Sequence, residues 1–314
     1  MIHMTLDPHP SFRWKKCGVL LAPSPEVDWC ISHTGPSFVA SFGGKPALFV
    51  TGRDSGNCSH IGLYELNWTS GELSVTQNSA RKVFSPGELG AFDESGVSYP
   101  WIVCHEGRIF MYYVGWVSGG RTRFQNYTGL AISDDGGATF RRALRTPILD
   151  RTQEEPFGSG SCAVWVDQDG WKMIYTSFEP WIGDGPQARP CYRLKEALSD
   201  DGISWRRTGR VVIDFAHPDE HIIGKPMVLR DRDVTRLWYS HRGAAYRIGY
   251  AESTNGQDFI RMDERVGIHV SANGWDSEMI EYAFVFDLNG DRFMIYNGND
   301  FGKTGLGYAR LEPK

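Results

Sequence analysis

Long hydrophobic runs and an excess of basic residues are both missing from this 314-residue sequence. No apolar stretch approaches the roughly 20 residues that a membrane-spanning helix needs. The first sixteen residues, MIHMTLDPHPSFRWKK, contain no apolar segment of the kind found in signal peptides. The formal net charge of −5 supplies no basic face for neutralising phosphates. We therefore expect neither a membrane nor a nucleic acid as a partner.

Paired cysteines and metal-ligand motifs are missing as well. The six cysteines stand singly, without a Cys-x-x-Cys pair, and the nine histidines include no pair at metal-ligand spacing. Nor does the sequence contain GxSxG, HExxH or a phosphate-binding glycine loop. This usage is typical of reduced thiols in a cytoplasmic protein. We expect that location, with no metal and no cofactor.

Glycine and aromatic residues, in contrast, are abundant. The 36 glycines, eleven tryptophans and 13% aromatic content favour an all-β protein with many tight turns over a helical bundle. Four-residue apolar runs recur in pairs joined by short polar turns, which indicates hairpins of buried strands. The paired runs are PWIV and MYYV from 100, CAVW and MIYT from 162, PMVL and LWYS from 226, AFVF and MIYN from 283, and a looser pair, PSFV and LFVT, from 36.

A third apolar run follows each hairpin, and in three repeats a turn and a fourth strand come next. These turn segments are SDDGGATFRR, SDDGISWRR and STNGQDFIRM, in which Asp-Gly and Asn-Gly supply a tight turn. A four-stranded antiparallel unit repeated about every 60 residues is typical of a β-propeller blade. A β-sandwich built from similar hairpins is the alternative.

We predict a single all-β domain over residues 1–314, folded as a five-bladed β-propeller. The last repeat lacks its outer strand, and the apolar run at 17–23 could supply it, so we expect an N-terminal strand to close the ring. The predicted blades lie near 33–80, 92–144, 154–213, 219–264 and 275–312.

Acidic residues recur in phase with the repeats. Seven positions before each closely matching inner run lie Asp93, Glu155, Asp219 and Asp276, while the first blade has Trp29 there. Glu220 and Glu278 lie beside two of them. Because inner strands of a propeller line its channel and start on one face, we expect these acids to converge at one mouth. The alternative for any one acid is a solvated loop residue or a structural hydrogen-bond acceptor, since repeats also repeat structural acids.

Loops expected at the same mouth carry side chains suited to a polyhydroxylated ligand. Aromatic rings stack on sugar C–H faces, and planar polar groups fix the orientation of hydroxyls. Arg53 and Arg242 end equivalent strands, where they either grip an anionic group or form salt bridges with the acids. The predicted substrate-binding residues are His33, Arg53, Asp54, Trp116, His241, Arg242, Asn297 and Asn299.

With these features the chain resembles the five-bladed β-propeller glycoside hydrolases, the superfamily of glycoside hydrolase families 32, 43, 68, 117 and 130. The resemblance rests on the repeated inner hairpins, the Ser-Asp-Asp-Gly turns, FDESGVSYP, DEHIIGKP, and WDSEMIEY with YNGND. It covers nearly the whole chain. SDDGGATF also matches a turn of the six-bladed sialidases, but no sixth repeat and no arginine triad accompanies it.

The resemblance implies a funnel with three carboxylates: a base or nucleophile, a general acid, and a third that tunes them. On that basis we expect Asp93 as base, Glu220 as acid and Glu155 as modulator, with Glu278 in reserve. Two departures stand out. The first blade reads HTGPSF, without the acid usual near its proline, and the third reads GSGSCAVW, without the usual Glu. Glu281 falls where some members have a general acid.

The sequence thus predicts a carbohydrate-active, glycosidase-like enzyme that cleaves or transfers a glycosidic bond of a saccharide or sugar conjugate. An anionic substrate is among the candidates. Two alternatives stay open. One is a phosphorylase, in which Arg53, Arg242 and histidines hold phosphate in place of a second carboxylate. The other is a propeller that binds glycans without turning them over.

Overall fold

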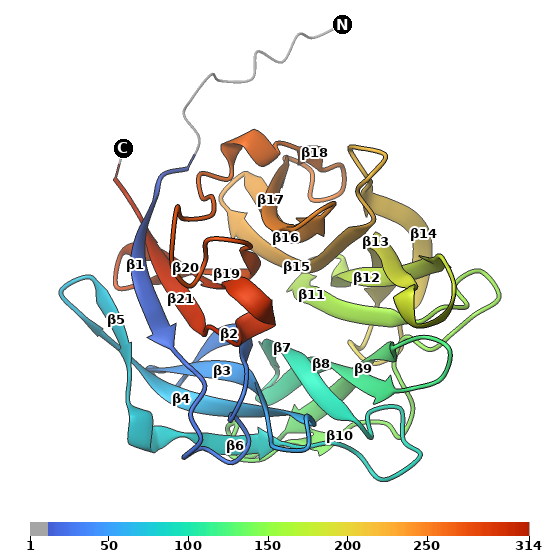
Figure 1. The fold of residues 1–314 in the computed structure, drawn as a ribbon, viewed down its shortest axis with the longest axis horizontal. Helices are drawn as coiled ribbons and strands as arrows, with labels where there is room; N and C mark the ends of the chain where they lie inside the picture. The colour runs from blue at the N-terminus through green and yellow to red at the C-terminus, as the bar shows by residue number, and fades with distance from the viewer. Residues whose placement is uncertain (1–11, 314) are drawn as a thin grey trace, which may run out of the picture.

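The computed structural model describes residues 12–313, which form twenty-one β-strands and four short 3-10 turns, with no α-helix among them (Figure 1). Residues 1–11 and 314, the two ends of the predicted domain, lie outside the described residues. Within 12–313 no helix is long and apolar enough to cross a membrane.

Hydrogen bonding joins the strands into three sheets of four, nine and eight strands, within which they group into five antiparallel units along the chain. Unit 1 contains β2 (Thr34–Phe42), β3 (Lys45–Arg53), β4 (Ser59–Thr69), β5 (Glu72–Val75) and β6 (Arg81–Phe84), and unit 2 contains β7 (Gly96–His105), β8 (Arg108–Ser118), β9 (Phe124–Ser133) and β10 (Arg141–Arg142). Unit 3 contains β11 (Ser159–Asp167), β12 (Gly170–Ile182), β13 (Arg189–Ser199) and β14 (Arg206–Ile213), and unit 4 contains β15 (Ile222–Asp231), β16 (Val234–Arg242), β17 (Tyr246–Ser253) and β18 (Ile260–Arg261).

Unit 5 joins the two ends of the described chain. Its strands β19 (Glu281–Leu288), β20 (Asp291–Asn297) and β21 (Leu306–Leu311) are followed in the sheet by β1 (Trp14–Leu21), which pairs antiparallel with β21. The strand expected at 17–23 therefore lies at 14–21 and takes the outer position of the last unit. The 3-10 turns are η1 (Gln77–Ser79), η2 (Gly185–Gln187), η3 (Asp263–Arg265) and η4 (Asn299–Gly302).

The first strand of each unit lies nearest the centre of the molecule (Figure 1). These inner strands contact one another in sequence order: β2 with β7, β7 with β11, β11 with β15, and β15 with β19. β19 in turn contacts β2. The beginning and end of the repeat array are thus neighbours, which brings residues far apart in the sequence to one central axis.

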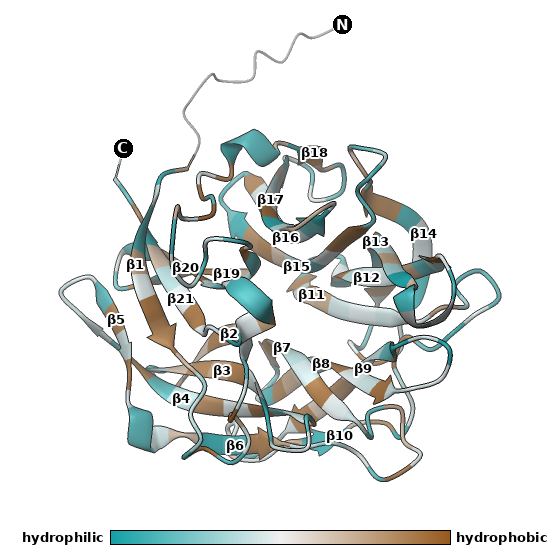
Figure 2. Cartoon of the chain, in the orientation of Figure 1, coloured by the Kyte–Doolittle hydropathy of each residue, from teal (hydrophilic) through white to brown (hydrophobic). Residues whose placement is uncertain are grey.

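The hydrophobic core lies between successive units and around the axis. Figure 2 shows hydrophobic segments along the strands and mostly hydrophilic connecting loops. On the axis, Phe38 of β2, Trp101 of β7 and Phe284 of β19 pack together, with ring centroids 4.3 to 6.2 Å apart. All three side chains are buried. We call these three rings, which belong to three of the five inner strands, the axial plug.

Candidate functional site

A cavity of about 560 Å³ lies where the inner strands begin. Its wall comes from the starts of the first and third strands of the units and from the ends of the second strands. The sequence analysis predicted that the loops with substrate-binding residues open on this same face. Aromatic side chains contribute much of the wall: Tyr99, Trp116, Phe124, Phe178, Tyr192, Tyr246, Tyr282 and Phe301.

Each inner strand carries one β-bulge at the same place, and the bulge presents a residue to the cavity. The pairing registers shift between Thr34 and Ser37 in β2, and at the corresponding positions of β7, β11, β15 and β19. Bulges re-aim side chains and are common near active sites. We call the residues just before the inner apolar runs the bulge positions; all line the cavity, and they are Gly35, Tyr99, Ser161, Lys225 and Tyr282.

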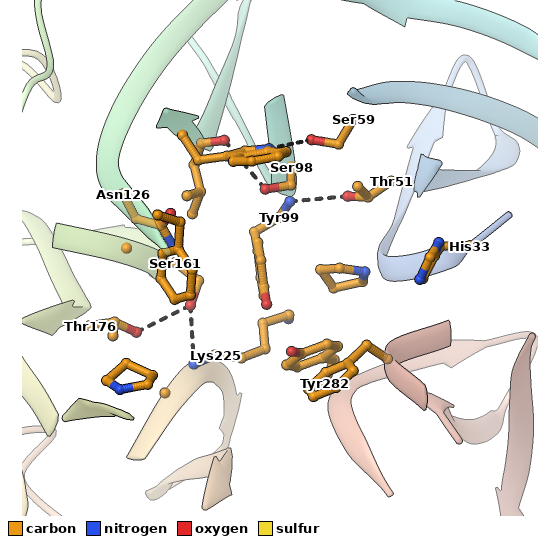
Figure 3. A pocket seen from close by; sticks show the side chains of 18 of the residues that line it. His33, Thr51, Ser59, Ser98, Tyr99, Asn126, Ser161, Thr176, Lys225 and Tyr282 are labelled. Carbon is orange, nitrogen blue, oxygen red and sulfur yellow. Dashed lines mark hydrogen bonds between the residues drawn. The ribbon is translucent and has the colours of Figure 1, made fainter. Parts of the chain in front are cut away.

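Three of the bulge positions hold non-glycine residues in the left-handed region. The φ angles are 55° at Tyr99, 50° at Lys225 and 59° at Tyr282. Bulky residues rarely adopt this conformation, and where it occurs the surroundings must enforce it. Hydroxyl groups of the preceding unit enforce it by accepting the backbone N–H: Thr51 accepts from Tyr99 at 3.1 Å and Ser161 from Lys225 at 3.1 Å (Figure 3). Ser240 accepts from Tyr282 in the same way, at 2.8 Å.

The cavity wall is basic, and no Asp or Glu among the described residues lines it. Arg53, Arg123, Lys225 and Arg242 line it, and none of these four forms an ion pair within 4.0 Å with a described carboxylate. Arg53 donates to Asn57 Oδ1 at 2.8 Å and lies 5.7 Å from the Trp116 ring centroid. The salt-bridge alternative for Arg53 and Arg242 is therefore not what the structure contains.

His33 shares this positive environment. Burial, together with the nearby Arg53 and Lys303, lowers the pKa of His33 to about 4. The imidazole is thus neutral at neutral pH, and Ser32 Oγ lies 2.8 Å from its Nδ1. A neutral ring can donate and accept hydrogen bonds, which suits contact with sugar hydroxyls.

A buried carboxylic acid lies directly behind the wall. Glu281, the first residue of β19, is fully buried, and neither of its oxygens has a hydrogen-bond partner among the described residues. Burial raises the pKa of Glu281 well above its usual value, against the influence of Tyr282 and Arg242. Tyr99, Tyr192, Tyr246 and Tyr282 surround it and face the cavity; the hydroxyls of Tyr192 and Tyr246 are 2.9 Å apart.

The in-phase acids occupy a different place from the cavity. Asp93, Glu155 and Asp276 are buried, while the fourth in-phase acid, Asp219, is exposed and its neighbour Glu220 is buried instead; none of these acids lines the cavity. Each buried acid binds side chains of its own unit, so the acids do not form the single acidic mouth expected from the sequence. The structural alternative describes them better, since a buried carboxylate must be paired.

These acids belong to a repeated arrangement that we call the anchor clusters. In each cluster the acid before the first strand binds the second strand and a basic residue of the fourth. The pairs are Asp93 with Tyr113 and Arg142, Glu155 with Tyr175 and Arg207, Glu220 with His241 and Arg261, and Asp276 with Tyr296 and Lys16, at donor–acceptor distances of 2.6 to 3.0 Å.

Glu220 illustrates the chemistry of a cluster. Burial would raise the pKa of Glu220, but hydrogen bonds from Arg261, His241 and the Ala216 backbone N–H hold it well below the usual range. The carboxylate is therefore ionised at neutral pH. A general acid needs a proton at working pH, and nothing in this cluster provides one.

The remaining predicted site residues divide between the cavity and the loops. His33, Arg53, Trp116 and Arg242 line the cavity. Asp54 instead accepts from His60 Nε2 at 3.0 Å, His241 binds Glu220, and Asn297 donates to the Thr34 carbonyl at 2.6 Å. Asn299 accepts the backbone N–H of Glu278, whose own side chain is exposed. No set of three or more potential metal ligands comes together within residues 12–313.

The sequence analysis missed the bulge positions and the tyrosines around Glu281. The signal was present: Gly35, Tyr99, Ser161, Lys225 and Tyr282 each stand one residue before an inner apolar run. In three of them proline follows directly, and proline confines the preceding residue. The residues one position before the inner apolar runs line the cavity, whereas the acids seven positions before them do not.

No protein-family model matches the chain. Two curated relatives from Mycobacterium tuberculosis, the uncharacterized proteins MT1551 (strain CDC 1551 / Oshkosh) and Rv1502 (strain ATCC 25618 / H37Rv), are each 37% identical to it over 304 residues. The match covers 95% of this chain and 99% of each relative. The chain belongs to the same family as these two proteins, whose names assign no activity.

Solved structures that share the fold include proteins described as glycoside hydrolases. A structure of the BT0996–RGII complex has a TM-score of 0.75 at 18% identity, and the match covers 96% of this protein and 93% of the other. A glycosyl hydrolase from Bacteroides ovatus has a TM-score of 0.75 at 13% sequence identity, and the match covers 98% of this protein and 96% of the other. A structure from work on glycoside hydrolases in the GH130 family of mannoside phosphorylases has a TM-score of 0.72 at 15% sequence identity. That match also covers 98% of this protein and 96% of the other. This protein therefore shares its nearly all-β fold with these glycoside hydrolase structures.

Proposed function

We propose that this protein is carbohydrate-active and that its central cavity binds a saccharide or sugar conjugate carrying an anionic group such as phosphate or carboxylate. One observation carries the proposal: within residues 12–313 the basic residues of the cavity lack the carboxylate partners that the arginines beside the buried acids have. Arg142, Arg207 and Arg261, for example, all bind buried acids. Unpaired guanidinium groups in a concave, aromatic site are suited to a ligand's anionic group.

We also propose that the five units are the blades of one closed, single-domain propeller. The cyclic contacts of the inner strands and the pairing of β1 with β21 support this. In such a ring the five bulge positions face a common axis, so one ligand can touch several units.

For turnover we favour phosphorolysis over hydrolysis. Hydrolysis needs a carboxylate pair across the scissile bond, and no described carboxylate lines the cavity. In phosphorolysis, phosphate held by Arg53 and Arg242 takes the place of the base and of water. Glu281 lies behind the cavity wall, and burial raises its pKa, so in this proposal its proton reaches the leaving oxygen through the hydroxyls of the tyrosines between them.

The hydrolytic alternative keeps Asp93, Glu155, Glu220 and Glu278 as catalytic carboxylates. It requires the anchor clusters to open, because three of these acids are engaged with arginines. Under that alternative Glu220→Gln abolishes turnover and leaves saccharide binding intact. Under our proposal, Glu220→Gln mainly lowers the stability of the fold.

Calorimetric titration with glucose, glucose 6-phosphate and glucuronic acid tests the proposed binding. We expect the anionic sugars to bind at least about tenfold more tightly than glucose, in line with one charge-assisted contact. Arg53→Met and Arg242→Met should remove most of that preference. Arg121→Met is the matched control, since Arg121 is an exposed arginine paired with Asp184 outside the cavity. Equal affinity for neutral and anionic sugars contradicts the proposal.

Incubation of oligosaccharides with inorganic phosphate tests the reaction. Formation of sugar 1-phosphate, lost in Glu281→Gln while binding persists, supports phosphorolysis. Free sugar formed at the same rate without phosphate supports hydrolysis. If ligands bind but no product forms under either condition, the protein is a binding module.

A further inference from the structure

Lys225 stands apart from the other basic residues of the cavity because it lies at its floor. The residue is 4% exposed and still lines the cavity, and Figure 3 shows its side chain extending from its strand toward the middle of the site. The ammonium nitrogen lies 6.0 Å from the ring centroid of Trp101 and 5.8 Å from that of Phe284, two members of the axial plug. It donates a long hydrogen bond, 3.5 Å, to the Ala283 carbonyl.

Among the described residues, the strands around Lys225 offer no counter-ion. The titratable groups there are Cys162 on β11, Tyr99 on β7, and Glu281 and Tyr282 on β19. Burial raises the pKa of all four, so each favours its uncharged form. The charged groups that share the cavity, Arg53, Arg123 and Arg242, are cations.

A lysine in such surroundings is costly to charge. Burial lowers the pKa of Lys225 to about 7, so a large share of the amine is neutral under physiological conditions. The backbone reinforces the placement: the left-handed φ of 50° and the N–H bond to Ser161 fix the residue at a bulge position. A side chain held this firmly in an unfavourable setting indicates a functional constraint.

We propose that Lys225 receives the anionic group of the saccharide at the cavity floor and takes up a proton when that group binds. The inference rests on the proposed function and adds two things to it. It places the anionic end of the ligand innermost, against the axial plug, and the rest of the saccharide toward the mouth. It also couples binding to protonation, because the ligand supplies the counter-ion that the surrounding strands do not provide.

The direction of the coupling follows from linkage. Below about pH 6 Lys225 is already protonated in the free protein, so binding takes up no proton there. Near pH 8 the free amine is mostly neutral while the complex holds ammonium, so proton uptake approaches one per ligand. Affinity therefore falls as pH rises from about 7. His33, with its low pKa, stays neutral across this range.

Calorimetry with inorganic sulfate and glucose 6-sulfate tests the proposal, because neither probe titrates in this range. Heats measured near pH 8 in buffers of different ionisation enthalpy give the number of protons taken up. We expect close to one proton for the natural protein. Lys225→Met should take up none and bind the sulfated sugar about tenfold or more weakly, as for loss of one charge-assisted hydrogen bond. Lys225→Arg, always charged, should bind without proton uptake.

The outcomes separate this inference from the proposed function. Binding of the sulfated sugar without proton uptake, or uptake that persists in Lys225→Met, overturns the role of Lys225 and leaves the anionic site standing. No binding of either probe at any pH overturns the anionic site itself. Lys15→Met, at an exposed position on β1, serves as the matched control. Unfolding curves of each variant show whether it is folded before its binding is compared.

Discussion

Glu281 is a buried carboxylic acid without a hydrogen-bond partner within residues 12–313, enclosed by tyrosines that face the cavity. An unsatisfied buried polar group costs stability and persists where function needs it. Its raised pKa has a direct consequence for folding. The folded protein keeps this proton where the unfolded chain, with an ordinary Glu pKa of about 4.3, has lost it. Glu281 thus lowers stability progressively as pH rises above that value.

We expect Glu281→Gln to stabilise the fold near pH 8 by on the order of 1 kcal/mol or more, and to change little near pH 4. Glutamine mimics the protonated acid and has no proton to lose. Urea unfolding at several pH values measures the difference. Glu278→Gln, at an exposed neighbouring position, is the control and should show no such trend. A gain of equal size at every pH rules out this explanation.

Individual site residues were only partly predictable from the sequence. His33, Arg53, Trp116 and Arg242 follow recognisable strand ends, and all four line the cavity. The catalytic assignments to Asp93 and Glu155 relied on an in-phase acid, and the assignment to Glu220 relied on the neighbour of one, a pattern that structural and functional residues share. What distinguishes the two roles is the basic partner on the fourth strand, which comes close to the acid only after the unit has folded.

At the scale of elements, the anchor clusters tie each unit together. The acid precedes the first strand, while its partners come from the second and fourth strands, as Glu155 shows with Tyr175 and Arg207. The sequence contained the partners within the turn segments, since Arg142 and Arg207 end SDDGGATFRR and SDDGISWRR. Unit 1, as far as the structure describes it, has Trp29 in place of the acid, and Trp29 packs against Tyr64 with centroids 5.8 Å apart.

Removing one acid should loosen one unit and leave the cavity chemistry unchanged. We expect Glu155→Gln to lower the free energy of unfolding by roughly 3 kcal/mol, because it removes the buried carboxylate that pairs with the partly buried Arg207. Glu154→Gln, one residue earlier and exposed, should have almost no effect. Denaturant unfolding measures both. If Glu155→Gln loses turnover while its stability is unchanged, Glu155 is catalytic and its structural role is contradicted.

The bulges depend on hydroxyl groups of the preceding unit, so their support can be tested separately. Thr51→Val removes the acceptor of the Tyr99 backbone N–H at nearly constant volume. We expect a loss of about 1–3 kcal/mol in stability, the cost of an unsatisfied buried donor, and weaker binding of anionic sugars because Tyr99 shifts. Thr208→Val, on an exposed stretch of β14, is the control. Unaltered sugar affinity in Thr51→Val contradicts a positioning role for this bond.

At the scale of the whole molecule, β1 joins the two ends of the described chain. It pairs with β21, and Lys16 of β1 donates to the buried Asp276 at 2.6 Å and to Ser271 at 2.9 Å. An outer strand from the N-terminal segment was predictable, because the last repeat visibly lacked one. The register of β1 against β21 was not predictable, because the periodicity of apolar residues does not show at which residue the pairing of two strands starts.

Loss of the contact between Lys16 and Asp276 should lower the stability of the whole protein. We expect Lys16→Met to destabilise the protein by roughly 3–5 kcal/mol, because Asp276 is left charged, buried and without its cation. Lys15→Met, on the exposed side of the same strand, should be close to neutral. Thermal and denaturant unfolding compare the two. Equal stabilities of the two variants would show that the Lys16 contact adds nothing to ring closure.

The axial plug of Phe38, Trp101 and Phe284 limits how a long glycan can be used. Because the three rings are buried and in contact, they leave no room for a polymer between their strands, so under the proposed function a saccharide enters from the side of the cavity. Whatever enters must leave by the same opening before the next molecule arrives. A glycan bound at the proposed site therefore contacts one face of the molecule and does not pass through it.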